Sequence, residues 1–154
     1  MKKVVLVALV AGLSAMGSAQ AQSVMGTWLT ASGAAQVRIG SCSDPSSGPI
    51  CGFIVSLANP KGPDGQPVTP DAATDFRNPN PQLRGRKVIG MPLIWGFKKA
   101  ANPNTFEDGQ IYNAENGKIY NANISLQADG TLRLRGYVGT PMFGETQVWT
   151  RVGQ

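Results

Sequence analysis

The stretch Lys118-Ile119-Tyr120-Asn121-Ala122-Asn123-Ile124-Ser125-Leu126 carries the clearest secondary-structure signal in the chain. Apolar and polar positions alternate along most of it, which is the period of a strand with one buried and one wet face. The inward face is expected to carry Tyr120, Ala122, Ile124 and Leu126. The outward face is expected to carry Ile119, Asn121, Asn123 and Ser125. The sequence therefore predicts a half-buried β-strand over 118–126.

The segments on either side predict that this strand belongs to antiparallel hairpins. Asn116-Gly117 precedes it and Asp129-Gly130 follows it, and both dipeptides readily adopt the positive φ of tight hairpin turns. Residues 131–138 repeat the alternation. We expect inward side chains at Leu132, Leu134, Gly136 and Val138, and outward ones at Arg133, Arg135 and Tyr137.

Similar patterns predict further strands over 24–30, 35–40, 52–57, 87–97, 106–112 and 145–152. Pro92 would force a bulge or an edge in its strand, because proline has no amide hydrogen to donate. About eight short strands joined by hairpins can remove their exposed edges by closing into an antiparallel up-and-down barrel. We therefore predict an all-β barrel, with an open sandwich as the alternative.

One long segment, residues 59–84, interrupts the strand pattern. It contains six of the eleven prolines and cannot form a central strand. Within it, Thr69-Pro70-Asp71-Ala72-Ala73 predicts a short helix, with a capping residue followed by proline at the first helical position. Connections of this length in compact domains are usually functional lids or disordered.

The first 21 residues are typical of a signal peptide. Lys2 and Lys3 precede a short apolar run, and Ala19-Gln20-Ala21 forms a cleavage site. The apolar run is too short to cross a bilayer. We expect a mature single domain over 22–154, with no transmembrane segment and a periplasmic or secreted location. Loss of the two lysines would reduce 14 basic residues to 12 against 9 acidic ones, too small an excess to favour nucleic-acid binding.

The residue types present argue against catalysis. Cys42 and Cys51 flank a turn-rich loop in a chain predicted to be exported, so we expect a disulfide; their spacing disfavours a catalytic thiol pair. The chain has no histidine, the commonest general base and metal ligand. Glu107 and Asp108 would face opposite sides of a strand. We therefore predict no enzyme, no metal and no cofactor.

Three groups of residues are candidates for a site or for the closure of the barrel. A polar cluster falls where the long segment returns to the barrel; it would bind an anionic or hydroxyl-rich group, or else hold the segment in place. An apolar set would line a pocket for a small molecule, or else fill the barrel. A third set would close the barrel, with the arginine over a tryptophan ring. The polar cluster is Asp75, Asn78, Arg84 and Arg86. The apolar set is Met91, Leu93, Trp95, Phe97, Tyr120, Ile124 and Leu126. The set that would close the barrel is Trp28, Trp149 and Arg151.

Several ordered motifs carry a resemblance to a known family. They are Gly26-Thr27-Trp28, Asp75-Phe76-Arg77-Asn78-Pro79-Asn80-Pro81-Gln82-Leu83-Arg84-Gly85-Arg86, Gly109-Gln110-Ile111-Tyr112, Gly117-Lys118-Ile119-Tyr120, Leu134-Arg135-Gly136-Tyr137 and Gln147-Val148-Trp149-Thr150-Arg151. From about Gly26 to Arg151 the chain resembles the bacterial exported family called domain of unknown function 2147. The resemblance implies a lipocalin-like barrel and an envelope or secreted location, and it implies no established activity. The cysteine pair departs from the family pattern.

These observations favour a protein that binds a small apolar or amphipathic molecule inside the barrel, with the long segment as its lid. The alternative is a cell-envelope interaction protein with a filled barrel, which would act on another protein through its loops. The sequence names neither the ligand nor a protein partner.

Overall fold

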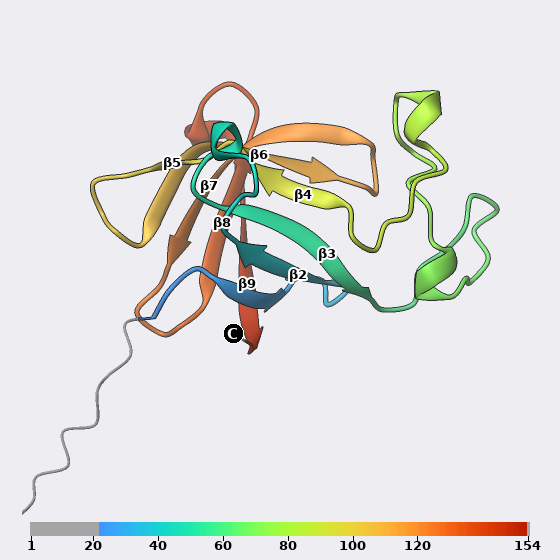
Figure 1. The fold of residues 1–154 in the computed structure, drawn as a ribbon, viewed down its shortest axis with the longest axis horizontal. Helices are drawn as coiled ribbons and strands as arrows, with labels where there is room; N and C mark the ends of the chain where they lie inside the picture. The colour runs from blue at the N-terminus through green and yellow to red at the C-terminus, as the bar shows by residue number, and fades with distance from the viewer. Residues whose placement is uncertain (1–21, 154) are drawn as a thin grey trace, which may run out of the picture.

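The computed structural model describes residues 22–153, so the predicted signal peptide lies outside the described residues. The described chain forms nine β-strands and four short 3-10 turns (Figure 1). The strands are β1 (Gly26–Leu29), β2 (Ala35–Gly40), β3 (Cys51–Leu57), β4 (Pro92–Trp95), β5 (Lys98–Lys99), β6 (Thr105–Asn113), β7 (Lys118–Leu126), β8 (Leu132–Tyr137) and β9 (Glu145–Gly153). None of the described helices is long and apolar enough to cross a membrane.

Eight of the strands close into an antiparallel barrel. The hydrogen-bonded order is β4-β3-β2-β1-β9-β8-β7-β6, and β4 pairs with β6 to complete the ring. The short β5 pairs antiparallel with the first residues of β6. This confirms the predicted all-β up-and-down barrel and rules out the open sandwich. The predicted strand over 87–97 is shorter than expected, since only Pro92–Trp95 pairs as β4.

The hairpin of β7 and β8 has the register that its alternation predicts. Ala122 pairs with Gly136, and Ile124 with Leu134, so these residues share the inner face. Tyr137 pairs with Asn121 on the opposite face, as expected, but its side chain is buried and not exposed to solvent. Val138, expected to face inward, lies beyond the end of β8, where it lines the open end of the barrel and is 70% exposed.

Pro92 introduces the irregularity that the sequence predicts. Phe53 pairs with Pro92 while the preceding Gly52 pairs with Ile94, so the register shifts by one residue. Because of this β-bulge, both Leu93 and Ile94 are buried, and the next residue, Trp95, points outward. The prediction that Trp95 shares an inward face with Leu93 was therefore wrong.

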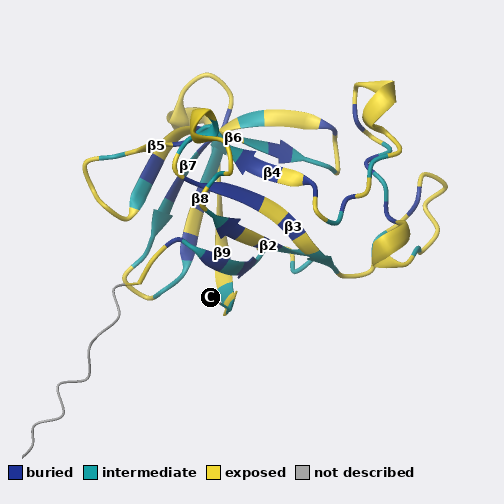
Figure 2. Cartoon of the chain, in the orientation of Figure 1, coloured by how far each residue is buried: buried dark blue, intermediate teal, exposed yellow. Residues whose placement is uncertain are grey.

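The core follows the inner face of the barrel, as the dark-blue positions along the strands show (Figure 2). Antiparallel pairing places the β2–β3 connection and the β7–β8 turn at one end, together with the start of β1. This end is filled by large apolar side chains. They include Val24, Ile50, Phe97, Phe106 and Ile124.

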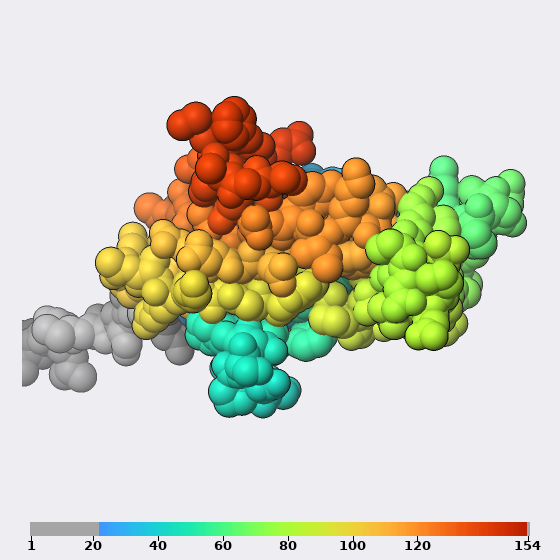
Figure 3. Space-filling view, turned by 90° about the horizontal axis from the view of Figure 1, so that it is seen from above, coloured from blue at the N-terminus to red at the C-terminus, as the bar shows by residue number. Residues whose placement is uncertain are grey.

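The long segment 59–84 projects from the opposite end of the barrel (Figures 1 and 3). It contains two 3-10 turns, η2 (Pro70–Ala72) and η3 (Pro81–Leu83), and its flanks form isolated bridges between Lys61 and Pro67 and between Thr74 and Lys87. The predicted helix at Thr69 is thus a single 3-10 turn. The Thr69 side chain makes no capping hydrogen bond to it.

Candidate ligand cavity and the groups around it

The second end of the barrel is hollow. It is surrounded by the β1–β2 turn, the β6–β7 turn, the β8–β9 loop and the root of segment 59–84. A cavity of about 500 Å³ lies between them. Its deeper apolar lining is Ile54, Leu57, Val88, Leu93, Ile111, Leu134 and Trp149. Its rim includes Thr30, Ser32, Asn113, Glu115, Asn116, Phe143 and Glu145.

Small residues on the inner face explain why this end is not filled. Gly136 faces inward opposite Ala122, and a methyl group added to it would meet only the Asn121 carbonyl oxygen, at 4.0 Å. On β6, where Gly109 pairs with the other side of Ala122, the situation is reversed. A methyl group on Gly109 would lie 2.4 Å from ring atoms of Phe97, which already fills that space. The same barrel therefore has a packed half and a hollow half.

Polarity in the cavity decreases with depth along β9. Glu145, Gln147 and Trp149 alternate on its inner face, paired in turn with Gly136, Leu134 and Leu132. The Trp149 indole N–H donates to the Gln147 side-chain oxygen at 3.0 Å, which satisfies the one polar group of that deep indole. An amphipathic molecule would place its apolar part at the floor and its polar group at the rim.

The seven residues expected to line a pocket are separated by the structure. Only Leu93 and Tyr120 line the cavity, where the Tyr120 hydroxyl accepts a hydrogen bond from Asn116 Nδ2 at 2.9 Å. Trp95 lies on the outer wall, and its indole N–H donates to Gln110 at 2.9 Å. The other four do not line the cavity: Met91, Phe97 and Ile124 are buried, and Leu126 is partly buried.

Sequence reasoning missed the residues that shape the rim and the empty space. Gly136 was expected to face inward but was not considered part of a site, and Glu115, Glu145 and Gln147 were not singled out. A glycine at an inward position of an alternating strand was the available signal, because it leaves a side-chain volume unfilled. The β8–β9 loop carried no such signal.

The polar cluster does come together, and Tyr112 of β6 joins it. Asp75 is almost fully buried. Its carboxylate accepts hydrogen bonds from the Tyr112 hydroxyl at 2.6 Å, from Asn78 Nδ2 at 2.8 Å and from Arg86 Nε at 3.0 Å. A second Arg86 nitrogen lies 2.9 Å from the same carboxylate. Arg84 donates to the Asn78 backbone oxygen at 2.8 Å.

This cluster is satisfied by protein groups alone. Within residues 22–153 no buried side-chain nitrogen or oxygen lacks a hydrogen-bond partner. Burial of Tyr112 and its hydrogen bond to Asp75 raise the pKa of the phenol to about 12, since both disfavour the phenolate. The geometry fastens segment 59–84 to the wall of the barrel at β6. It leaves no buried polar atom turned toward a ligand.

The first and last strands meet beside Trp28. The Arg151 guanidinium lies 4.2 Å from the centre of the Trp28 ring, a cation-π geometry. The same guanidinium donates to the backbone oxygen of Met25 at 2.9 Å and to that of Ser23. The Trp28 indole N–H donates to Val24 O at 2.8 Å. Trp149 is also buried, but the arginine lies over Trp28.

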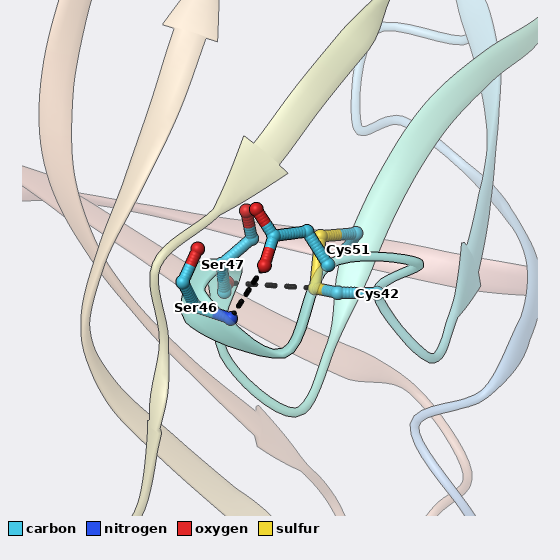
Figure 4. Close-up of a disulfide and its surroundings, with 5 residues drawn as sticks. Cys42, Ser46, Ser47 and Cys51 are labelled. Carbon is cyan, nitrogen blue, oxygen red and sulfur yellow. Dashed lines mark hydrogen bonds between the residues drawn. A yellow bond between two sulfur atoms is a disulfide. The ribbon is translucent and has the colours of Figure 1, made fainter.

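Cys42 and Cys51 form the expected disulfide (Figure 4). In the loop between them, the Asp44 carboxylate accepts from the Ser46 amide at 2.9 Å, and this hydrogen bond lowers the pKa of Asp44. The Gly96 amide donates to Ser47 O at 2.7 Å, so the loop packs against the chain that follows β4. The described residues contain no group of three or more His, Cys, Asp or Glu side chains placed to hold a metal ion.

Comparison with known proteins adds a fold likeness and a family. No curated protein matches the chain. A solved structure, protein HP1028 from the human pathogen Helicobacter pylori, described as belonging to the lipocalin family, superposes with a TM-score of 0.66 and 21% identity. The superposition covers 86% of this chain and 84% of that one, and at this identity it shows the fold alone. Residues 26–151 match the model of the family described as "Uncharacterized protein conserved in bacteria (DUF2147)". The chain therefore belongs to this family of uncharacterized bacterial proteins.

Proposed function

We propose that this protein binds one small apolar or amphipathic molecule in the hollow half of its barrel. The observation that carries the proposal is the cavity of about 500 Å³, which lies within the range of small-molecule sites. Its deep part is lined by aliphatic side chains and by Trp149, and its polar groups gather at the rim. A barrel of eight strands is wide enough for one small ligand only where its inner side chains are small.

In this proposal the protein binds its ligand outside the cytosol and does not act as an enzyme. The signal-peptide pattern and the disulfide both favour an oxidising compartment, the periplasm or the exterior. The chain has no histidine, and both cysteines are bonded to each other. The function is therefore to hold or carry a molecule.

A neutral apolar fluorophore, N-phenyl-1-naphthylamine, tests the proposal directly. We expect it to bind with a Kd of about 1 μM or lower, equivalent to about 8 kcal/mol, and to quench Trp149 at the cavity floor. Gly136→Leu should weaken binding by about tenfold or more, because the added side chain fills the cavity from its wall. Trp95→Ala is the matched control, since Trp95 lies on the outer wall. Native mass spectrometry of protein purified from its own host would detect a retained ligand.

A second candidate function, the binding of another protein, has a specific observation in its favour. An apolar groove of about 550 Å³ lies on the outer wall between the disulfide loop and segment 59–84. Phe53 and Ile119 line it and are 39% and 54% exposed. If saturating fluorophore neither binds nor raises the Tm, the cavity is not a ligand site, and this second function replaces the first.

A further inference from the structure

The rim of the cavity has a consistent sign of charge. Glu115 and Glu145 both line it, whereas no lysine or arginine is among the described residues that do. This contrasts with the whole chain, which carries 14 basic and 9 acidic residues. Among the described residues, the charged side chains that line the cavity are therefore all acidic.

The strand register fixes Glu145 on the inner wall. It pairs with Gly136, which in turn pairs with Ala122, so the three positions share the inward face at the hollow end. Gly136 has no side chain to fill the space beside Glu145, and a methyl group there would meet no atom closer than 4.0 Å. Glu115 lies in the β6–β7 turn, where its amide donates to Asn113 Oδ1 at 2.8 Å. Neither glutamate belongs to an ion pair within the described chain.

Two cations lie near these glutamates in the sequence or the sheet. Lys118 follows Glu115 by three residues and pairs with Asn113, but its side chain is exposed and does not line the cavity. Arg135 precedes Gly136 and therefore lies on the outer face, where it pairs with Thr146. Its guanidinium donates to Thr146 Oγ1 at 2.7 Å and to the backbone oxygens of Pro141 and Met142. These contacts hold the β8–β9 loop, and Arg135 does not line the cavity. Among the described residues, the two carboxylates therefore form no ion pair with a residue of the cavity wall.

We infer that the ligand is a cationic amphiphile, with an amine or quaternary ammonium group at the rim and an apolar tail on Trp149. This inference rests on the proposed function and specifies its ligand class. Carboxylates attract a cation and repel the head group of a fatty acid. Tyr120 and Phe143 line the same cavity, and aromatic rings beside carboxylates are typical of ammonium sites.

Three probes that share one apolar tail and differ in head-group charge separate the effect of the tail from that of the charge. They are decyltrimethylammonium, decanol and decanoate, each below its micelle concentration. Calorimetry at low salt should show the cation binding at least about fivefold more tightly than decanol, and decanoate more weakly than decanol. Added salt should narrow these differences, because exposed charges are screened.

The variants Glu145→Gln and Glu115→Gln, combined, should bring the affinity for the cation down to that for decanol, with both measured on the same double variant. Glu107→Gln is the matched control, because this exposed acid on β6 does not line the cavity. Decanoate binding as tightly as the cation, or a preference that survives the double variant, overturns the inference. If decanol binds and head charge has no effect, only this inference fails. If none of the three binds, the proposed function fails with it.

Discussion

The Tyr112 hydroxyl on β6 lies 2.6 Å from the Asp75 carboxylate in the long segment, and both groups are buried. The phenol must keep its proton to donate, and its burial, together with the neighbouring carboxylate, raises its pKa to about 12. A raised pKa in the folded state means that folding favours the protonated phenol. The hydrogen bond that attaches segment 59–84 therefore stabilises the fold fully below the ordinary tyrosine pKa, near pH 10. This stabilisation is lost as the pH rises toward about 12.

The first prediction follows from this hydrogen bond. Alkaline titration followed by tyrosinate absorbance should show one phenol that ionises near pH 12, which disappears in Tyr112→Phe. The unfolding free energy of the native protein should fall between pH 10 and 12, and that of Tyr112→Phe should fall less. A wild-type titration curve identical to that of the variant, after subtraction of one ordinary tyrosine, would contradict the prediction.

The two arginines of the polar cluster should contribute unequally to stability. The Asp75 side chain is 0% exposed and that of Arg86 is 31% exposed, so Arg86→Ala leaves a buried carboxylate without its cation. We expect a loss of about 3 kcal/mol of unfolding free energy. Arg84 donates one hydrogen bond to a backbone oxygen, so Arg84→Ala should cost about 1 kcal/mol. Denaturant melts measure both, and equal losses would mean that the ion pair contributes nothing of its own.

The sequence was sufficient to predict the barrel because the strand signals are local. Alternation in Tyr120, Ala122 and Ile124, with Asx-Gly turns on both sides, specifies both strand and hairpin within a few residues. The same local logic failed at β4, where Pro92 predicted a bulge but not its consequence. A bulge shifts the side chains that follow it to the opposite face, and this moved Trp95 outside.

The cavity could not be predicted from these patterns, because it depends on volumes contributed by distant strands. Phe97 fills the space in front of Gly109, whereas the nearest atom to a methyl group on Gly136 would be 4.0 Å away. Such pairings depend on the relative stagger of the strands, which alternation alone does not specify. The polar cluster was found in advance because most of it lies within one short stretch. Its anchor Tyr112 was not found, since it is 37 positions away from Asp75.

The disulfide should stabilise the folded barrel measurably. It joins β3 to the loop after β2 and encloses a short segment that packs on Gly96. Replacing both cysteines by serine should lower the unfolding free energy by about 2 to 3 kcal/mol, according to the loop-entropy model. Denaturant melts of the double variant and of reduced wild type should agree. Two free thiols in unfolded protein that was made in the periplasm would contradict the pairing itself.

Arg151 should stabilise the junction of β1 and β9. Its guanidinium packs on Trp28 and binds the backbone of residues that precede β1. Arg151→Ala should therefore cost about 1 to 2 kcal/mol, through lost packing, cation-π contact and hydrogen bonds. Arg133→Ala is the control, because Arg133 is exposed on β8. An unchanged denaturation midpoint for Arg151→Ala would mean that this contact does not hold the strands together.

Two inward glycines should respond oppositely to the same added methyl group. Neither has a positive φ, so the backbone accepts alanine at both positions. At Gly109 the methyl would meet the Phe97 ring at 2.4 Å, and the packed half cannot yield, so Gly109→Ala should cost about 1 to 3 kcal/mol. At Gly136 the nearest atom is 4.0 Å away, and Gly136→Ala should be neutral or stabilise by up to about 1 kcal/mol, because alanine restricts the unfolded chain. Thermal melts of the two variants measure the difference. If Gly136→Ala destabilises as much as Gly109→Ala, the space at this end of the barrel is already filled, and the ligand site proposed there does not exist.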